Sequence, residues 1–145
     1  MKEKTATINW RGQGKKGQGE ISTESGALKA YPYGFGSRFE NDLRGTNPEE
    51  LLGAAHAACF TMAFSFACEK AGLVTAQVET RAAVSLVSDG EGFKIDRIAL
   101  EMNATVPGID DTRFQQIAQD AKQNCPLSKA LASVPEISLR ASLNK

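Results

Sequence analysis

The sequence LLGAAHAACFTMAFSFAC spans residues 51–68 and contains no formally charged side chain. Apolar and small side chains occupy nearly every position, so a helix formed by this run has no polar face and must be covered on all sides. A chain of 145 residues can hardly wrap such a helix alone. We therefore predict a long buried central helix that packs against a second copy of the chain in a homodimer.

The same run just reaches the length of about 18 residues at which a membrane span has to be considered. Its transfer to lipid would be weakly driven, because the run is rich in alanine and has charged residues on both sides. The polar and flanking residues are Gly53, His56, Thr61, Ser65, Glu49, Glu50, Glu69 and Lys70. We expect a core helix and no membrane partner.

The start of this helix is well marked in the sequence. Asn47 suits the N-cap, Pro48 the first helical position, and Glu50 the third, where a carboxylate can reach back to the cap amide. Glu50 then has a structural role, which leaves Glu49 available for another. We expect the helix to continue to about Ala71.

Alternating apolar and polar residues on both sides of the helix predict strands. Residues 19–23 can pair back onto residues 6–10 across a glycine-rich turn. After Gly72, two more alternating runs meet at a turn of residues 89–92, and a slip between Ile95 and Ile98 suggests a bulge. The remaining elements are a turn at Pro107 and Gly108, a helical stripe at residues 114–121, a short helix at residues 127–132 and a strand at residues 137–143. This order predicts an α+β fold with antiparallel sheets in one domain, residues 1–145.

Two segments rich in glycine need separate interpretations. Gly12, Gly14 and Gly17 have the spacing of a dinucleotide-binding loop, but that loop requires a helix after it and here a strand follows. We therefore expect no nucleotide cofactor. The second segment, residues 31–40, combines glycines and aromatic residues without a clear period, and we expect an ordered loop.

The composition narrows the function classes. Seventeen basic and seventeen acidic residues balance, and the cluster of Lys15 and Lys16 has no aromatic neighbours on which bases could stack, so we expect no nucleic-acid partner. The N-terminus MKEKTATINW lacks the apolar segment of a signal peptide, which favours a cytoplasmic location. Three cysteines are too few for a disulfide scaffold and have no zinc spacing, so we expect no metal site and favour redox or nucleophilic thiol chemistry.

Cys59 is the candidate reactive thiol. A cysteine with a pKa near 8.5 is only about 3% thiolate at pH 7, and burial would raise that pKa further. A guanidinium at about 4 Å is worth a nominal 4 kcal/mol at an effective dielectric near 20, which could outweigh moderate desolvation. Arg38 is our candidate for this cation and Glu49 for its partner, although Glu49 and Cys59 are about 80° apart around a helix and about 15 Å apart along it. The alternative is that Arg38 is a solvated loop charge.

Three other residues near this chemistry have competing interpretations. Cys59 and Cys125, which precedes Pro126, could both be structural cysteines that act as small apolar groups. Cys68 lies nine positions after Cys59, on the opposite face of the helix, so we expect an inert core thiol. His56, one turn before Cys59, could be the base of a cysteine hydrolase, but a packed or dimer-facing histidine is the stronger expectation.

Four segments together resemble the OsmC/Ohr family, and most closely its OsmC branch of osmotically inducible proteins. They are TNPEELLGAAHAACF around Cys59, the YPYGFGSRFE segment, the VPGID turn and NCPLSKAL around Cys125. The resemblance covers essentially the whole chain. It implies an intertwined homodimer with two active sites at the subunit interface, and a thiol-dependent peroxidase that acts on organic hydroperoxides in oxidative or osmotic stress.

The resemblance also implies roles for individual residues. Cys59 resembles the peroxidatic cysteine, Cys125 the resolving cysteine, Arg38 the activating arginine and Glu49 the carboxylate that holds it. A sulfenic acid at Cys59 would condense with Cys125, and an external dithiol, such as one of the lipoyl type, would reduce the disulfide. The second hypothesis is a non-catalytic stress protein that binds an apolar ligand at the dimer groove. The third is the hydrolase that uses Cys59 and His56.

Overall fold

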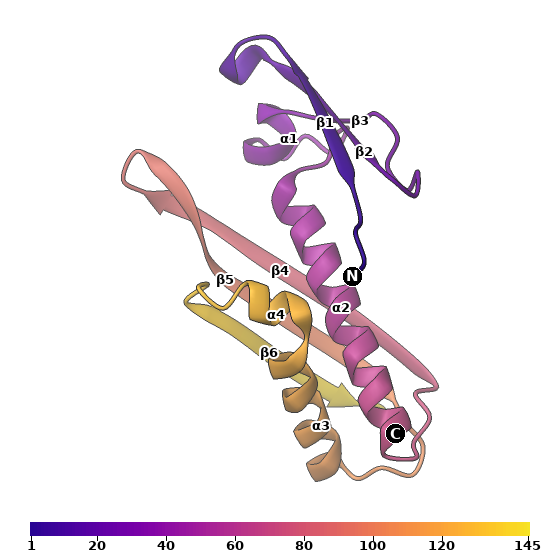
Figure 1. Ribbon diagram of the computed structural model, residues 1–145. Coiled ribbons are helices and arrows are strands. Elements are labelled where there is room, and N and C mark those ends of the chain that lie inside the picture. The colour runs from indigo at the N-terminus through magenta and orange to yellow at the C-terminus, as the bar shows by residue number, and fades with distance from the viewer. The chain divides into compact units, whose positions relative to one another are not determined.

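The computed structural model describes all residues from 1 to 145. The chain forms two compact units, Met1–Leu51 and Leu52–Lys145. Figure 1 labels their helices and strands: the first unit contains the indigo and purple strands β1–β3, and the second contains β4–β6 with α3 and α4. Each unit has its own three-stranded sheet.

The first unit contains an antiparallel sheet with the strand order β1-β2-β3. Its strands are β1 (Ala6–Arg11), β2 (Gln18–Thr23) and β3 (Tyr31–Tyr33). The predicted pairing of residues 19–23 with the first strand is confirmed, with Ile8 opposite Ile21. A short 3₁₀-helix, η1 (Gly14–Lys16), connects β1 to β2, so a strand follows the glycine-rich turn, as the sequence predicts.

Two glycines of β2 and its turn make room for aromatic rings. A Cβ atom at Gly17 would collide with the ring of Trp10, and one at Gly19 would collide with the ring of Tyr33. The two rings pack against each other at a centroid distance of 5.6 Å. Of the three glycines with the spacing of a nucleotide-binding loop, Gly17 therefore serves packing, whereas Gly12 and Gly14 adopt the positive φ angles of the turn, 95° and 44°.

The prediction of an ordered loop at residues 31–40 is wrong. The segment contains β3 and a single-turn helix, α1 (Phe35–Phe39). The backbone N–H of Gly34 donates to Ser37 Oγ at 3.0 Å, and this hydroxyl donates to the carbonyl of Thr46 at 2.6 Å. Elements this short have no detectable period, and contacts with distant residues stabilise them.

Helix α2 (Pro48–Lys70) starts in the first unit and continues into the second. Its predicted cap is confirmed, because the N–H of Glu50 donates to Asn47 Oδ1 at 2.7 Å. The second half of the predicted capping box is wrong: the Glu50 carboxylate accepts from the hydroxyl of Thr46 at 2.7 Å. Thr46 is buried at the helix start and offers Glu50 a donor there.

The second unit folds around a mixed sheet with the strand order β4-β5-β6. Its elements besides α2 are β4 (Gln77–Asp89), β5 (Gly92–Thr105), α3 (Asp111–Asn124), α4 (Pro126–Ala130) and β6 (Glu136–Leu143). β4 and β5 form the predicted antiparallel hairpin, but β6 is parallel to β5, which corrects the prediction of antiparallel sheets throughout. Residues 106–135 form a crossover through α3 and α4, the kind of connection that parallel pairing requires.

The predicted bulge lies in the β4–β5 hairpin. Ser85 pairs with Arg97 and Leu86 pairs with Ile95, so Asp96 is the extra residue. The slip between Ile95 and Ile98 is therefore confirmed as a register shift.

The core of the second unit lies between the sheet and the three helices, which cover one face of β4–β6 in Figure 1. One stripe of α2 is buried in this core, namely Gly53, His56, Phe60, Phe64 and Cys68. Phe64 meets Phe114 of α3 edge to face at a centroid distance of 5.6 Å. This stripe confirms that α2 is a core helix, although its length and composition would also suit a membrane span.

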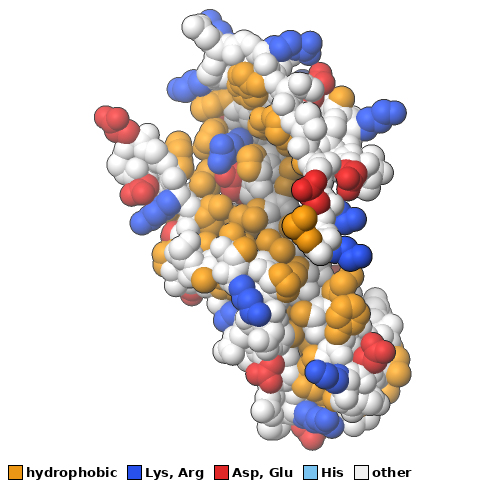
Figure 2. Space-filling view, viewed as in Figure 1, with side chains coloured by type: hydrophobic (Ala, Val, Ile, Leu, Met, Phe, Trp, Pro, Cys, Tyr) orange, Lys and Arg blue, Asp and Glu red, His pale blue; other side chains and the backbone are white.

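The other side of α2 is uncovered within one chain. Met62 is 59% exposed and Phe66 is 62% exposed, and hydrophobic side chains are visible along the helix in Figure 2. An apolar groove of about 670 Å³ runs along this side and is lined by Ala54, Ala57, Ala58, Met62, Phe66 and three hydroxyl residues. The chain alone therefore buries only one side of the predicted central helix.

Candidate functional site

The second unit brings two of the predicted site residues into contact. Cys125 Sγ donates to Cys59 Sγ at 3.0 Å, and both thiols are free. Cys125 is completely buried and Cys59 is half-buried. A disulfide would require the two sulfurs to approach to about 2.05 Å, so a shift of about 1 Å separates this arrangement from a covalent bond.

A break between two helices positions Cys125. Its N–H donates to the carbonyl of Ala121 at 3.0 Å and closes α3, and its carbonyl accepts from Lys129 at 3.1 Å in α4. Pro126 is the first residue of α4 and cannot continue α3, because proline has no N–H to donate. The thiol therefore projects from the junction of two helices, across from the middle of α2.

The surroundings of Cys59 within this unit favour the neutral thiol. Burial raises the pKa of Cys59 most, and the hydrogen bond from Cys125 raises it further. A hydrogen bond from the backbone N–H of Leu127 acts in the opposite direction and lowers this pKa. The net shift within the second unit is upward, because desolvation there exceeds the effect of one amide donor, and the lowering expected from Arg38 stays a prediction.

The first unit brings the other two predicted residues together. Arg38 of α1 donates to Glu49 of α2 through Nε at 3.1 and 3.2 Å and through Nη2 at 2.6 Å. The Arg38 side chain is 37% exposed and that of Glu49 only 12%. Two nitrogens meeting one carboxylate fix the plane of the guanidinium. Arg38 is therefore paired and lies in a helix instead of a loop, but its side chain stays exposed, as the alternative of a solvated charge expects.

His56 has a structural partner. Its Nε2 lies 2.8 Å from Ser128 Oγ, and its Nδ1 is buried without a hydrogen-bond partner. Burial lowers the pKa of His56, so the ring is neutral at pH 7. Neither ring nitrogen bonds to Cys59, so the dyad of the hydrolase hypothesis is not formed, and the expectation of a packed histidine is confirmed.

Cys68 is confirmed as a core thiol. It lies on the buried side of α2 and is completely enclosed by the core. Burial raises its pKa, and the charge of Arg113 offsets only part of that effect. The structure therefore distinguishes Cys59, which has a thiol partner and partial exposure, from Cys68, which has neither.

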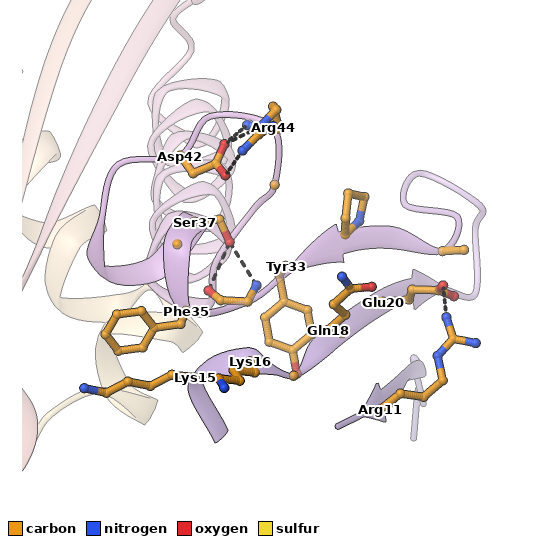
Figure 3. Close-up of a pocket in the computed structure, with 17 residues that line it drawn as sticks. Arg11, Lys15, Lys16, Gln18, Glu20, Tyr33, Phe35, Ser37, Asp42 and Arg44 are labelled. Carbon is orange, nitrogen blue, oxygen red and sulfur yellow. Dashed lines mark hydrogen bonds and ion pairs between the residues drawn. The ribbon is translucent and has the colours of Figure 1, made fainter. Parts of the chain in front are cut away.

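A separate groove of about 660 Å³ lies in the first unit and contains none of the predicted site residues. Figure 3 shows its arginines paired with carboxylates: Arg44 pairs with Asp42 at 2.8 Å and Arg11 with Glu20 at 3.3 Å. Lys15 Nζ lies 5.1 Å from the centre of the Phe35 ring. The sequence analysis missed this groove because its lining comes from four short, separate segments.

Comparisons with known proteins identify the relatives of this chain. The family model of OsmC-like proteins matches residues 39–140. Peroxiredoxin OsmC of Escherichia coli K12 is 50% identical over 128 residues, which cover 88% of this chain and 89% of that protein. The chain belongs to the OsmC family. An organic hydroperoxide resistance protein of Xanthomonas axonopodis pv. citri is 32% identical over 96 residues, 66% of each chain.

Solved structures of OsmC-type proteins have the same fold. An organic hydroperoxide resistance protein from Elizabethkingia anophelis superposes with a TM-score of 0.77 at 26% identity, covering 99% of this chain and 98% of that one. A Vibrio cholerae homologue with captopril in one of its active sites gives a TM-score of 0.74 at 26% identity, covering 99% and 92%. The resemblance and the α+β fold expected from the sequence are thus confirmed.

The OsmC family match includes three of the four predicted site residues. Glu49, Cys59 and Cys125 lie within residues 39–140, and Arg38 lies immediately before that range. Two functional groups were not predicted from the sequence, namely Ser128 and the amide of Leu127, because no local pattern around Cys125 marks either of them.

Proposed function

We propose that this OsmC-family chain is a thiol-dependent peroxidase that reduces organic hydroperoxides to alcohols in oxidative or osmotic stress defence. The observation that carries the proposal is the contact between two reduced thiols, Cys59 and Cys125, at 3.0 Å. The names of its relatives support it: one is a peroxiredoxin and another an organic hydroperoxide resistance protein.

The proposed reaction has two chemical steps. The Cys59 thiolate attacks the distal oxygen of the hydroperoxide, the O–O bond breaks, and the alkoxide leaves and takes up a proton to become the alcohol. Cys59 is now a sulfenic acid. Cys125 attacks its sulfur, water leaves, and a Cys59–Cys125 disulfide forms. An external dithiol, such as one of the lipoyl type, then reduces this disulfide and is itself oxidised.

Arg38 is proposed to supply the positive charge that this chemistry needs. The groups around Cys59 in the second unit raise its pKa, so a thiolate requires a cation from elsewhere. Arg38 would stabilise the thiolate and then the charge on the leaving alkoxide, while Glu49 holds the guanidinium in one orientation. The bidentate pair supports a positioned arginine.

The proposed active protein is a cytoplasmic homodimer. The uncovered side of α2, with Met62 and Phe66 more than half exposed, supports a second copy as its cover. Because this surface is apolar, we expect apolar hydroperoxides to be better substrates than hydrogen peroxide. The second hypothesis, binding of an apolar ligand without catalysis, is favoured by the apolar groove on the same side of α2.

Peroxide consumption by the purified protein tests the proposal. With a dithiol such as dithiothreitol present, the protein should consume tert-butyl and cumene hydroperoxide through many turnovers. The Cys59→Ser variant should consume neither, while Cys68→Ala serves as the matched control on the same helix and should remain active. Unchanged turnover in Cys59→Ser, or inert thiols in the wild type, would refute the peroxidase and favour the binding protein.

A further inference from the structure

Two contacts join the same turn of α2 to the first turn of α4. His56 and Cys59 lie three residues apart on α2, and Cys125 and Ser128 lie three residues apart at the start of α4. His56 bonds to Ser128 at 2.8 Å and Cys59 to Cys125 at 3.0 Å. The hydrogen bond is thus one helical turn from the thiol contact.

The His56 end of the His56–Ser128 bond is buried, and Ser128 is half-buried. His56 is completely buried, and its Nδ1 already lacks a partner. If Ser128 moved away, both ring nitrogens would be unpaired in an apolar core, which is unfavourable for any buried polar group. The bond therefore favours the arrangement in which α4 is docked on α2.

Docking of α4 determines two features of the Cys59 environment. It places the Cys125 thiol in contact with Cys59, and it aims the N–H of Leu127 at the Cys59 sulfur. α4 has only five residues, with Pro126, Lys129 and Ala130 exposed, so it has little buried surface of its own. Ser128 is its side chain that hydrogen-bonds to another helix.

We propose that the His56–Ser128 hydrogen bond is a positioning contact that holds the first turn of α4 against α2, and so sets how readily Cys125 forms a disulfide with Cys59. The bond takes no part in proton transfer or in the attack on peroxide. The inference rests on the proposed function for the origin of the oxidised Cys59, but the readiness of the two thiols to pair is a property of the protein alone.

Equilibration with glutathione redox buffers tests the inference without peroxide. The fraction of Cys59–Cys125 disulfide, measured by mass spectrometry after alkylation, gives the effective concentration of one thiol relative to the other. Ser128→Ala should lower this effective concentration about five- to tenfold, the size expected for one partly buried hydrogen bond. Ser128→Thr, which keeps the hydroxyl, should restore most of it.

Two controls distinguish positioning from a general loss of structure. Ser133→Ala removes a hydroxyl from the exposed turn after α4 and should leave the effective concentration unchanged. In a His56→Leu background, Ser128→Ala should have no further effect, because its partner is already absent. Equal effective concentrations in wild type and Ser128→Ala, or an equal loss in Ser133→Ala, would overturn the inference.

One equivalent of tert-butyl hydroperoxide then separates this inference from the proposed function. In Ser128→Ala, the sulfenic acid at Cys59 should persist longer and react more with dimedone than in the wild type, about in proportion to the loss of effective concentration. Wild-type protein that forms neither sulfenic acid nor disulfide would refute the proposed function, while the glutathione equilibrium would still decide the positioning role. Where the wild type does form the sulfenic acid, equal dimedone labelling of the two proteins would overturn the positioning role.

Discussion

The Arg38–Glu49 pair of the first unit and the Cys59–Cys125 pair of the second unit differ in what surrounds their polar atoms. The arginine side chain is 37% exposed and meets its carboxylate through two nitrogens, whereas Cys125 is completely buried and Cys59 half-buried. An exposed ion pair adds little to stability, and a buried thiol is a weak nucleophile. The groups around Cys59 in the second unit thus raise its pKa, whereas the Arg38 charge belongs to the first unit.

The largest effect should come from removing the second thiol. Cys125→Ser should still consume about one equivalent of hydroperoxide, because Cys59 is intact, but the sulfenic acid then has no thiol partner in contact. Steady-state turnover with dithiothreitol should fall about a hundredfold or more, since an intramolecular reaction becomes bimolecular. Stopped-flow measurements give the single equivalent of hydroperoxide consumed, and steady-state assays give the loss of turnover. Full turnover without Cys125 would show that the thiol contact is structural.

Removing the cation should have the next largest effect. Arg38→Met should lower the rate constant for the first oxidation of Cys59 by about ten- to a hundredfold, the effect of a shift of one to two pKa units. Glu49→Gln should have a smaller effect, because the arginine stays but is less well oriented. Arg44→Met is the matched control, since Arg44 is paired with Asp42 in the groove of the first unit. If Arg44→Met lowered this rate constant as much as Arg38→Met does, the result would contradict a specific role for Arg38.

Cys59 and Cys68 should differ although they share one helix. Cys68 is completely buried and its pKa is raised by burial, so iodoacetamide should modify Cys59 in the folded protein and Cys68 only after unfolding. Cys68→Ala should retain activity within about twofold while losing about 1 kcal/mol of unfolding free energy from the cavity it leaves. Residue-specific mass spectrometry and chemical denaturation measure the two effects. Rapid labelling of Cys68 in folded protein would contradict its burial.

The smallest effect concerns pH. The pKa of His56 in the folded protein lies below its ordinary 6.5, so the unfolded chain binds a proton there more readily than the folded one. The associated stability is fully present above pH 6.5 and is lost as the pH falls from there through the folded-state pKa. Denaturation at several pH values should show this loss in the wild type and a smaller one in His56→Leu. The same pH dependence in both proteins would show that His56 does not cause it.

Elements with strong local signals were predictable from the sequence. The cap at Asn47, the alternation in β4 and β5 and the apolar stripe of α3 each depend on residues close in sequence. The parallel direction of β6 and the identity of β3 depend on pairing with distant strands, which no local pattern specifies. The predicted bond from the cap amide to Glu50 was wrong, because the hydroxyl of the buried Thr46 donates to this carboxylate instead.

The site was predictable only in part. Cys59 and Cys125 are 66 positions apart, so their contact follows from the family resemblance and not from spacing. The pairing of Arg38 with Glu49 was anticipated, and its geometry is bidentate. Burial and the Cys125 thiol raise the pKa of Cys59 against one amide, so the low pKa expected from Arg38 stays a prediction. Ser128 was missed because a serine in a short helix carries no chemical signal without its buried partner.

The pKa of Cys59, measured from the pH dependence of its alkylation rate by residue-specific mass spectrometry, tests the central claim most directly. We expect a midpoint below the value of about 8.5 for free cysteine in the wild type, and one at or above that value in Arg38→Met. Midpoints at or above about 8.5 in both proteins would contradict the claim that Arg38 counteracts the burial of this thiol.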